Sequence, residues 1–182
     1  MNKTLELAVK LSNHSLSDVV EFGIFRGKTV NQLRNSFDET IPLYGFDSFD
    51  GLPEDWTGTT LKAGDLSTKG EIPYISGVKI YDGWFEDTIK EYMKVANPIK
   101  LLHIDSDLYS SAITVLYNLK EFIVSGTIIV FDEWVYNHKD IEENRQHEQK
   151  AFYEWVKDFD IEYELIPRMD GPDMERQIVI IK

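Results

Sequence analysis

The chain has 182 residues, of which 42% are hydrophobic and 13% aromatic, enough to build the core of one domain. Its 32 acidic and 19 basic residues give a formal net charge of −13, which repels phosphate backbones and anionic lipid and disfavours nucleic acid and membranes as partners. Cysteine is absent, which excludes disulfides, thiolate nucleophiles and zinc–sulfur sites. No apolar run is typical of a signal peptide or a membrane span, so we expect a soluble, cytoplasmic protein.

Short segments rich in Val, Ile, Phe and Tyr predict seven β-strands. In chain order they are residues 17–22, 42–47, 77–81, 99–105, 127–132, 161–166 and 177–182. The first five are nearly continuous in apolar character, which is typical of strands covered on both faces. Amphipathic segments between them predict helices at residues 29–37, 84–95, 110–124 and 143–157.

This alternation predicts an α/β fold with a mostly parallel sheet and helices on both faces. Only residues 167–176, which include Pro, Gly and Asp, separate the last two strands, so we expect the final strand to run antiparallel. No repeat or linker interrupts residues 1–182, which we interpret as one domain. Residues 48–76 are too long for an ordinary connection and include Phe49, Leu52 and Trp56, which favours an ordered, lid-like loop.

Ligands of such sheets bind at the carboxyl ends of the strands. The first strand runs into EFGIFRGKT, residues 21–29, where Gly23 and Gly27 allow a tight turn and close approach to a ligand. The spacing does not fit the dinucleotide fingerprint, and it is one residue short of a phosphate-binding P-loop. Because residues 128–133 imitate the magnesium-binding strand of an ATPase, a P-loop-like nucleotide-binding protein stays as a minor alternative. A glycine turn that serves only packing is another.

The ends of the second and third strands suit a nucleoside. Asp47 closes the second strand, where an acidic side chain can hold both hydroxyls of a ribose. Asp82, Trp84 and Phe85 follow the third strand and can give adenine an apolar wall and a polar contact. Core packing of the two aromatics is an equally good interpretation. With Glu21 and the glycine turn, these residues indicate an adenosine-type ligand.

Two acidic pairs follow the fourth and fifth strands. Asp105 and Asp107 end one strand, Asp132 and Glu133 end the other, and neighbouring parallel strands bring their ends together. Carboxylates gathered in this way repel one another unless a cation or protons neutralise them. Oxygen ligands suit Mg²⁺. We therefore favour a metal site over the alternative, in which these side chains are solvated helix caps.

The histidines carry less information. We interpret His103, near the end of the fourth strand, as a buried core residue. His138 and His147 follow the second acidic pair and can line an acceptor pocket, although a surface position is favoured for each.

Taken together, these segments resemble a known family. EFGIFRGKT is similar to the first motif of class I S-adenosylmethionine (SAM) methyltransferases. DSFDGLP at 47–53, GWFEDT at 83–88, HIDSDLYS at 103–110 and residues 126–133 follow in order and resemble the macrocin O-methyltransferase family. The resemblance implies the Rossmann-like, seven-stranded methyltransferase fold, SAM as methyl donor, and a Mg²⁺ ion that binds two neighbouring oxygens of the acceptor.

By motif position, the resemblance also implies roles for individual residues. The SAM site would comprise Glu21, Phe22, Gly23, Arg26, Gly27, Thr29, Asp47, Ser48, Asp82, Gly83, Trp84, Phe85 and Asp105. The metal ligands would be Asp105, Asp132 and Glu133, and the catalytic pair would be Asp105 and Asp107, with Asp107 as the general base. His103, Ser106 and Glu133 stand where the family usually has arginine, glycine and aspartate.

The expected function is SAM- and Mg²⁺-dependent O-methylation of a small-molecule hydroxyl acceptor, a sugar or another vicinal diol. A SAM-binding domain without catalysis is the alternative, and it draws support from the short segment before the first strand, since relatives carry a longer cap there. The complete acidic set argues against it. The sequence leaves the acceptor and the oligomeric state open, a homo-oligomer included.

Overall fold

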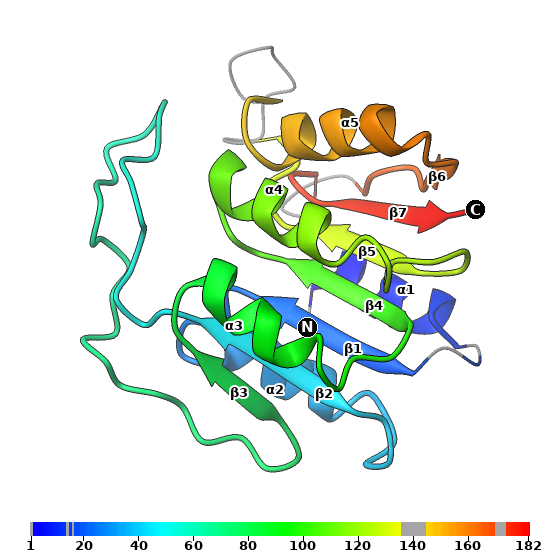
Figure 1. Cartoon of the computed structure of the whole chain (residues 1–182), viewed down its shortest axis with the longest axis horizontal. Helices are drawn as coiled ribbons and strands as arrows, with labels where there is room; N and C mark the ends of the chain where they lie inside the picture. The colour runs from blue at the N-terminus through cyan, green and yellow to red at the C-terminus, as the bar shows by residue number, and fades with distance from the viewer. Residues whose placement is uncertain (1, 14, 16, 136–144, 170–173) are drawn as a thin grey trace.

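The computed structural model describes residues 2–13, 15, 17–135, 145–169 and 174–182, which form one seven-stranded sheet between two layers of helices (Figure 1). The strands are β1 Asp18–Phe22, β2 Leu43–Asp47, β3 Lys79–Asp82, β4 Ile99–Ile104, β5 Ile128–Phe131, β6 Tyr163–Leu165 and β7 Gln177–Ile181. The helices are α1 Lys3–Leu11, α2 Lys28–Arg34, α3 Phe85–Tyr92, α4 Tyr109–Asn118 and α5 Glu148–Phe159. Every predicted strand is present, with its ends displaced by two residues at most.

The strand order is β3-β2-β1-β4-β5-β7-β6. The first five strands run parallel, and β7 runs antiparallel to both β5 and β6, as predicted. After β3 the chain returns to the middle of the sheet and places β4 beside β1. The carboxyl ends of β1 and β4 therefore form the switch point at which ligands of open α/β sheets bind.

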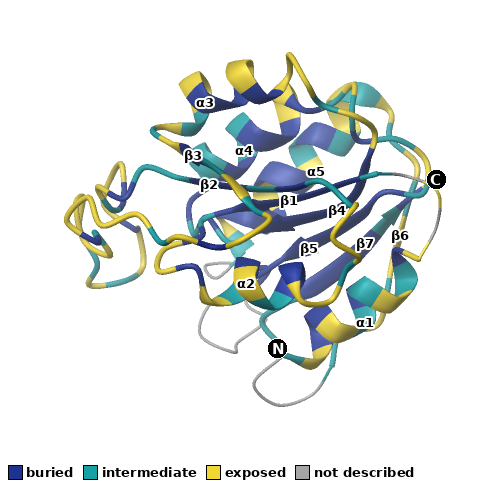
Figure 2. Cartoon of the chain, turned by 90° about the horizontal axis from the view of Figure 1, so that it is seen from below, coloured by how far each residue is buried: buried dark blue, intermediate teal, exposed yellow. Residues whose placement is uncertain are grey.

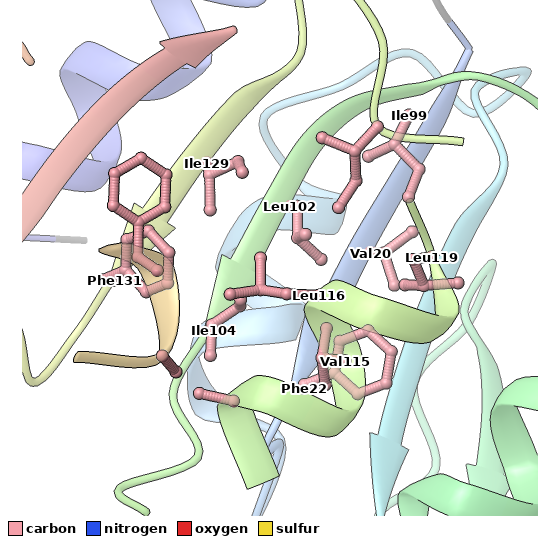
Figure 3. Close-up of a cluster of buried hydrophobic side chains, with 14 of the residues drawn as sticks. Val20, Phe22, Ile99, Leu102, Ile104, Val115, Leu116, Leu119, Ile129 and Phe131 are labelled. Carbon is pink, nitrogen blue, oxygen red and sulfur yellow. The ribbon is translucent and has the colours of Figure 1, made fainter. Parts of the chain in front are cut away.

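Two apolar clusters cover the two faces of the sheet (Figure 2). Successive strand residues point to opposite faces, so Val20 packs under α3, α4 and α5, whereas Val19 packs under α1 and α2. The larger cluster includes Leu102, Leu116 and Phe131 (Figure 3). All five residues of β1 are buried, which explains why this strand lacks an alternating pattern.

The predicted helices are present with shifted ends: α2 and α3 each end three residues early, and α5 spans Glu148–Phe159 rather than 143–157. The helix predicted at 110–124 ends at Asn118, because the chain turns and the carbonyl of Phe122 accepts the amide of Ile99 at 2.9 Å. The helix α1 was not predicted. Only its Thr4, Leu5 and Ala8 are buried, too few for a clear apolar period, and the side chain of Asn2 caps its first turn.

The loop 48–76 packs against the rest of the chain. Leu52 and Trp56 form a small apolar cluster with Leu108, which precedes α4. Backbone hydrogen bonds close the loop on itself, among them the amide of Leu52 to the carbonyl of Asp65 at 2.9 Å. The expected order of this segment is therefore present, and its action as a lid stays a prediction. None of the described helices combines the length and the apolar character that a membrane span requires.

Candidate active site

A cavity of about 720 Å³ lies at the carboxyl ends of β1, β2 and β4, within the roughly 300–1,000 Å³ typical of small-molecule sites. Of the predicted site residues, its lining includes Gly23, Asp47, Ser48, Trp84, Phe85, Asp105 and Asp107. Phe25, Leu52 and Leu66 add apolar wall, and Ser106, Ser110 and Thr114 add hydroxyl groups. The cavity thus combines apolar surface with acidic side chains at the switch point of the sheet.

The other predicted SAM-site residues lie outside this lining. They are Glu21, Phe22, Arg26, Gly27, Thr29, Asp82 and Gly83. The ring of Phe22 is buried, stacks on Phe46 with centroids 4.3 Å apart and meets the edge of Phe85 at 5.0 Å. Phe22 therefore supports one aromatic of the cavity wall from within the core.

Packing accounts for both glycines of the first turn. A Cβ on Gly23 would lie 1.7 Å from the carbonyl oxygen of Asp105, and the backbone at Gly23 has a φ of +86°. A Cβ on Gly27 would lie 2.6 Å from Ile75. The predicted alternative, a glycine turn required by packing, thus explains these residues, and Gly23 additionally lines the cavity.

Asp47 fixes the cavity wall at the end of β2. Its Oδ2 accepts the amide of Phe25 at 2.7 Å, and its Oδ1 accepts the amide of Phe49 at 2.8 Å. Each carboxylate oxygen has a second lone pair and can accept a ligand hydroxyl as well. The geometry is compatible with the predicted contact to a ribose.

Three carboxylates gather where β4 and β5 end. Asp105, Asp132 and Glu133 each offer an oxygen within 4.8 Å of the others. The pairing of β4 with β5 brings them together, since the amide of Asp132 donates to the carbonyl of Ile104 at 2.9 Å. The predicted convergence is therefore present. The buried Oε2 of Glu133 has no hydrogen-bond partner among the described residues, which is costly unless a cation or proton approaches it. This donor set fits a hard divalent cation such as Mg²⁺.

The protonation equilibria reflect the crowding of negative charge. Burial, and next the charge of Asp132, raise the pKa of Asp105 well above its ordinary value. Burial, and next the charge of Asp105, do the same to the pKa of Glu133. Burial also raises the pKa of Asp107 to about 7, with Asp132 and Asp47 adding to the shift. Burial and the repulsion between neighbouring carboxylates thus favour the protonated forms of these three groups.

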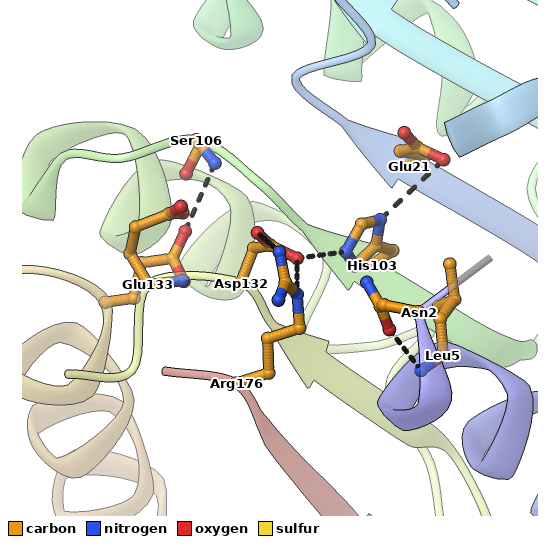
Figure 4. A network of polar contacts seen from close by, with 9 residues as sticks. Asn2, Leu5, Glu21, His103, Ser106, Asp132, Glu133 and Arg176 are labelled. Carbon is orange, nitrogen blue, oxygen red and sulfur yellow. Dashed lines mark hydrogen bonds and ion pairs between the residues drawn. The ribbon is translucent and has the colours of Figure 1, made fainter. Parts of the chain in front are cut away.

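Asp132 differs because two cationic groups hold it (Figure 4). Arg176 donates to its two oxygens at 2.6 and 2.7 Å, and Nε2 of His103 lies 3.4 Å from its Oδ1. Burial alone would raise the pKa of Asp132, but His103 and Arg176 outweigh burial and lower it to about 2. Asp132 therefore stays ionised while its neighbours titrate.

His103 is buried in the core, as predicted, between two carboxylates (Figure 4). Its Nδ1 lies 3.7 Å from Oε2 of Glu21. Burial opposes its protonation, but the carboxylates of Asp132 and Glu21 raise the pKa of His103 well above its ordinary value. Glu21, expected in the SAM site, is fully buried beside His103 instead of lining the cavity.

The sequence did not point to Arg176 or Glu148. Arg176 directly precedes β7, and the antiparallel register of β7 with β5 brings its start beside Phe131 and hence Asp132. The predicted antiparallel hairpin was therefore the sequence signal that could have located Arg176. Glu148 is the first residue of α5 and is fully buried, where it accepts the amides of Ser106 at 3.1 Å and Glu133 at 3.0 Å. No local pattern separates it from Asp158 and Asp160, the exposed acids near the end of the same helix.

His147 contacts the loop 48–76 rather than the cavity. It is buried, its Nε2 lies 3.1 Å from the carbonyl oxygen of Thr57, and its ring meets Trp56 edge-on at 6.0 Å. The favoured surface position was therefore wrong. His138 lies outside the described residues.

Comparison with known proteins bears on the family resemblance and on the fold. A model of the macrocin-O-methyltransferase (TylF) family matches residues 75–160, which include α3, β4, α4 and β5 and both acidic pairs. No curated protein is similar enough in sequence to count as a relative.

Solved structures share the fold. CalS11, described as a calicheamicin methyltransferase, has a TM-score of 0.74 at 18% identity, over 97% of this chain and 77% of its own. The O-methyltransferase NovP has a TM-score of 0.70 at 22% identity, over 98% and 79%. The protein cmcI, in a structure described as Mg-SAM, has a TM-score of 0.57 at 11% identity, over 98% and 70%. At these identities the likeness shows the fold alone. The family match over residues 75–160 and the shared fold agree with the resemblance that the motifs predicted: the chain has the methyltransferase fold and is similar to the TylF family over that segment.

Proposed function

We propose that the chain is a SAM-dependent O-methyltransferase that uses Mg²⁺ and acts on a hydroxyl of a small molecule with neighbouring oxygens, such as a sugar. The observation that carries this proposal is the convergence of Asp105, Asp132 and Glu133 beside a cavity lined by Asp47 and Trp84. One end of the site thus suits a nucleoside, and the other suits a hard cation and the oxygens that it binds.

The donor would lie across the ends of β1, β2 and β4. Asp47 would accept the ribose hydroxyls, and Trp84 and Phe85 would pack on the adenine, because all three line one cavity. Asp105 and Asp107, on the same cavity, give the sulfonium of SAM a negative surrounding. The description of cmcI as a Mg-SAM structure supports the same pair of ligands.

Asp105, Asp132 and Glu133 would hold the Mg²⁺ ion, which when bound supplies positive charge that favours ionisation of an acceptor hydroxyl. Asp107 would take the proton, since its carboxyl group lines the same cavity as Asp105. The acceptor oxygen forms a bond to the methyl carbon as the bond from that carbon to sulfur breaks, which leaves S-adenosylhomocysteine (SAH). Most of the acceleration would come from orientation, because the sulfonium is already an activated leaving group.

A sugar is the acceptor class that the comparisons favour. CalS11 is described as a TDP-rhamnose 3'-O-methyltransferase, and the TylF family is described by macrocin O-methylation. Two neighbouring hydroxyls of a sugar would fit together at the proposed metal site. We propose a small molecule of this kind rather than nucleic acid, which the net charge of −13 repels.

The test begins with calorimetry of SAM and SAH binding. It continues with methyl transfer to a panel of sugars and other diols, before and after chelation and with Mg²⁺ added back. We expect SAM binding, and transfer that chelator stops and Mg²⁺ restores. Transfer that ignores the chelator would remove the metal from the proposal. Binding of ATP without binding of SAM would instead favour the P-loop-like alternative. Binding of SAM without transfer to any diol would favour the non-catalytic one.

A further inference from the structure

Glu148 is a buried acid that the proposed reaction does not use. We infer that it is a positioning residue, which holds the ends of β4 and β5 at the spacing that the metal ligands need; this inference rests on the function proposed above for that site. Glu148 lies on α5, 42 residues after Ser106 and 15 residues after Glu133, and is 0% exposed.

Its two oxygens bridge the two strand ends. Oε1 accepts the amide of Ser106, the residue after Asp105, at 3.1 Å. Oε2 accepts the amide of Glu133, itself a proposed ligand, at 3.0 Å. The backbone hydrogen bonds between β4 and β5 end with the one from the amide of Asp132 to the carbonyl of Ile104. Beyond this point, the carboxylate of Glu148 links the two segments that follow the strands.

A carboxylate is the side chain that this position requires. Two backbone donors face it, and only a carboxylate of this length offers an acceptor to each. Glutamine would turn an NH₂ group toward one of the amides, and alanine would leave two buried donors unpaired. Glu148 is also absent from the groups of described residues whose oxygens converge as ligands, so its part differs from that of Asp105 or Glu133.

Core packing of α5 fixes the position of Glu148. Behind Glu148, α5 buries Ala151, Phe152 and Trp155 in the larger apolar cluster. The position of the carboxylate is thus set by core packing, and the strand ends take their spacing from it. Residues that orient metal ligands typically change metal affinity about 10–100-fold when they are replaced.

The experiment compares E148Q with E154Q. Glu154 lies on the same helix and accepts a hydrogen bond from the hydroxyl of Tyr109 rather than from the backbone amides of Ser106 and Glu133, so it is a matched control. In the metal-free chain, NMR exchange of the amides of Ser106 and Glu133 should be faster in E148Q and unchanged in E154Q. Calorimetry should show about 10–100-fold weaker Mg²⁺ binding in E148Q only, with SAH affinity retained. Saturating Mg²⁺ should restore methyl transfer by E148Q, because its ligands are intact, and should not restore D105N.

E148D is the second variant, in case E148Q does not fold. It keeps the carboxyl group but is shorter by one methylene, so Mg²⁺ affinity should lie between those of the wild type and E148Q. Wild-type Mg²⁺ affinity in every folded variant, or an equal loss of SAH and Mg²⁺ binding, would overturn the positioning role alone. A wild-type chain that binds no Mg²⁺ would instead overturn the metal site itself, and the positioning role with it.

Discussion

Asp107 combines two properties that are unusual for a turn residue and common at reaction centres. Its backbone has a φ of +64°, a left-handed conformation that costs a residue other than glycine free energy, and the amide of Leu108 bonds back across it to the carbonyl of Ser106 at 2.6 Å. Its carboxyl group lines the cavity and has a pKa raised to about 7, chiefly by burial. The surrounding structure thus maintains a costly geometry at the position proposed for the general base.

Replacement of Asp107 by asparagine should therefore impair proton transfer more than binding. We expect D107N to lower kcat by about 10²- to 10⁴-fold, with SAH and Mg²⁺ affinity close to the wild type. Steady-state kinetics at saturating SAM measures the change, and D87N, an exposed acid of α3, is the control. An unchanged kcat in D107N would assign the proton to another group.

The ion pair of Arg176 with Asp132 makes a second prediction for single residues. R176Q leaves Asp132 with His103 alone, so the free energy of unfolding without metal should fall by about 1–3 kcal/mol. Mg²⁺ should recover part of this loss, because it supplies a new cation to the same carboxylate. Urea denaturation with and without Mg²⁺ tests this. Equal losses in both conditions would mean that Arg176 and the metal do not share Asp132.

At the scale of elements, the glycine turn that follows β1 packs against the backbone at the end of β4. In G23A, the new Cβ would collide with the carbonyl oxygen of Asp105, so the strand ends must separate. In G64A, also at positive φ but with no atom within 4 Å, only the left-handed backbone is penalised, by about 1–2 kcal/mol. We expect G23A to lose clearly more stability than G64A in thermal unfolding. Similar losses would show that the contact of β1 with β4 relaxes freely.

The contact of His147 with the loop 48–76 predicts a dependence on pH. Burial lowers the pKa of His147, the bond to Thr57 and the charge of Glu54 oppose this, and Lys150 adds to it. Below about pH 6.5 the unfolded chain therefore takes up a proton that the folded chain resists, so this residue makes stability fall as pH falls. The difference between wild type and H147Q isolates the effect from the other titrating groups. A difference that is flat between pH 7 and 5 would contradict it.

At the scale of the whole molecule, features that depend on neighbouring residues in the sequence were predictable, whereas features that depend on tertiary packing were not. The strands were predictable because burial on both faces leaves continuous apolar runs, as in β5, and the parallel order then brought Asp105 to Asp132. Glu148 was not, because its burial depends on how α5 docks in three dimensions. The glycine turn suggested a ligand from its sequence, yet the closest constraint on Gly23 is the backbone of Asp105.

The excess negative charge of the chain is partly concentrated at this one edge of the sheet. Burial and mutual repulsion raise the pKa of Asp105, Glu133 and Glu148 there. These unfavourable interactions lower the free energy of unfolding of the chain without metal. Mg²⁺ at 100 times its Kd should add about 2.7 kcal/mol to the free energy of unfolding. NaCl at equal ionic strength should not, because screening acts weakly on buried charges. Thermal unfolding with Mg²⁺, with chelator and with NaCl measures this, and D105N should lose the gain. Stabilisation of D105N equal to that of the wild type would mean that the ion binds elsewhere.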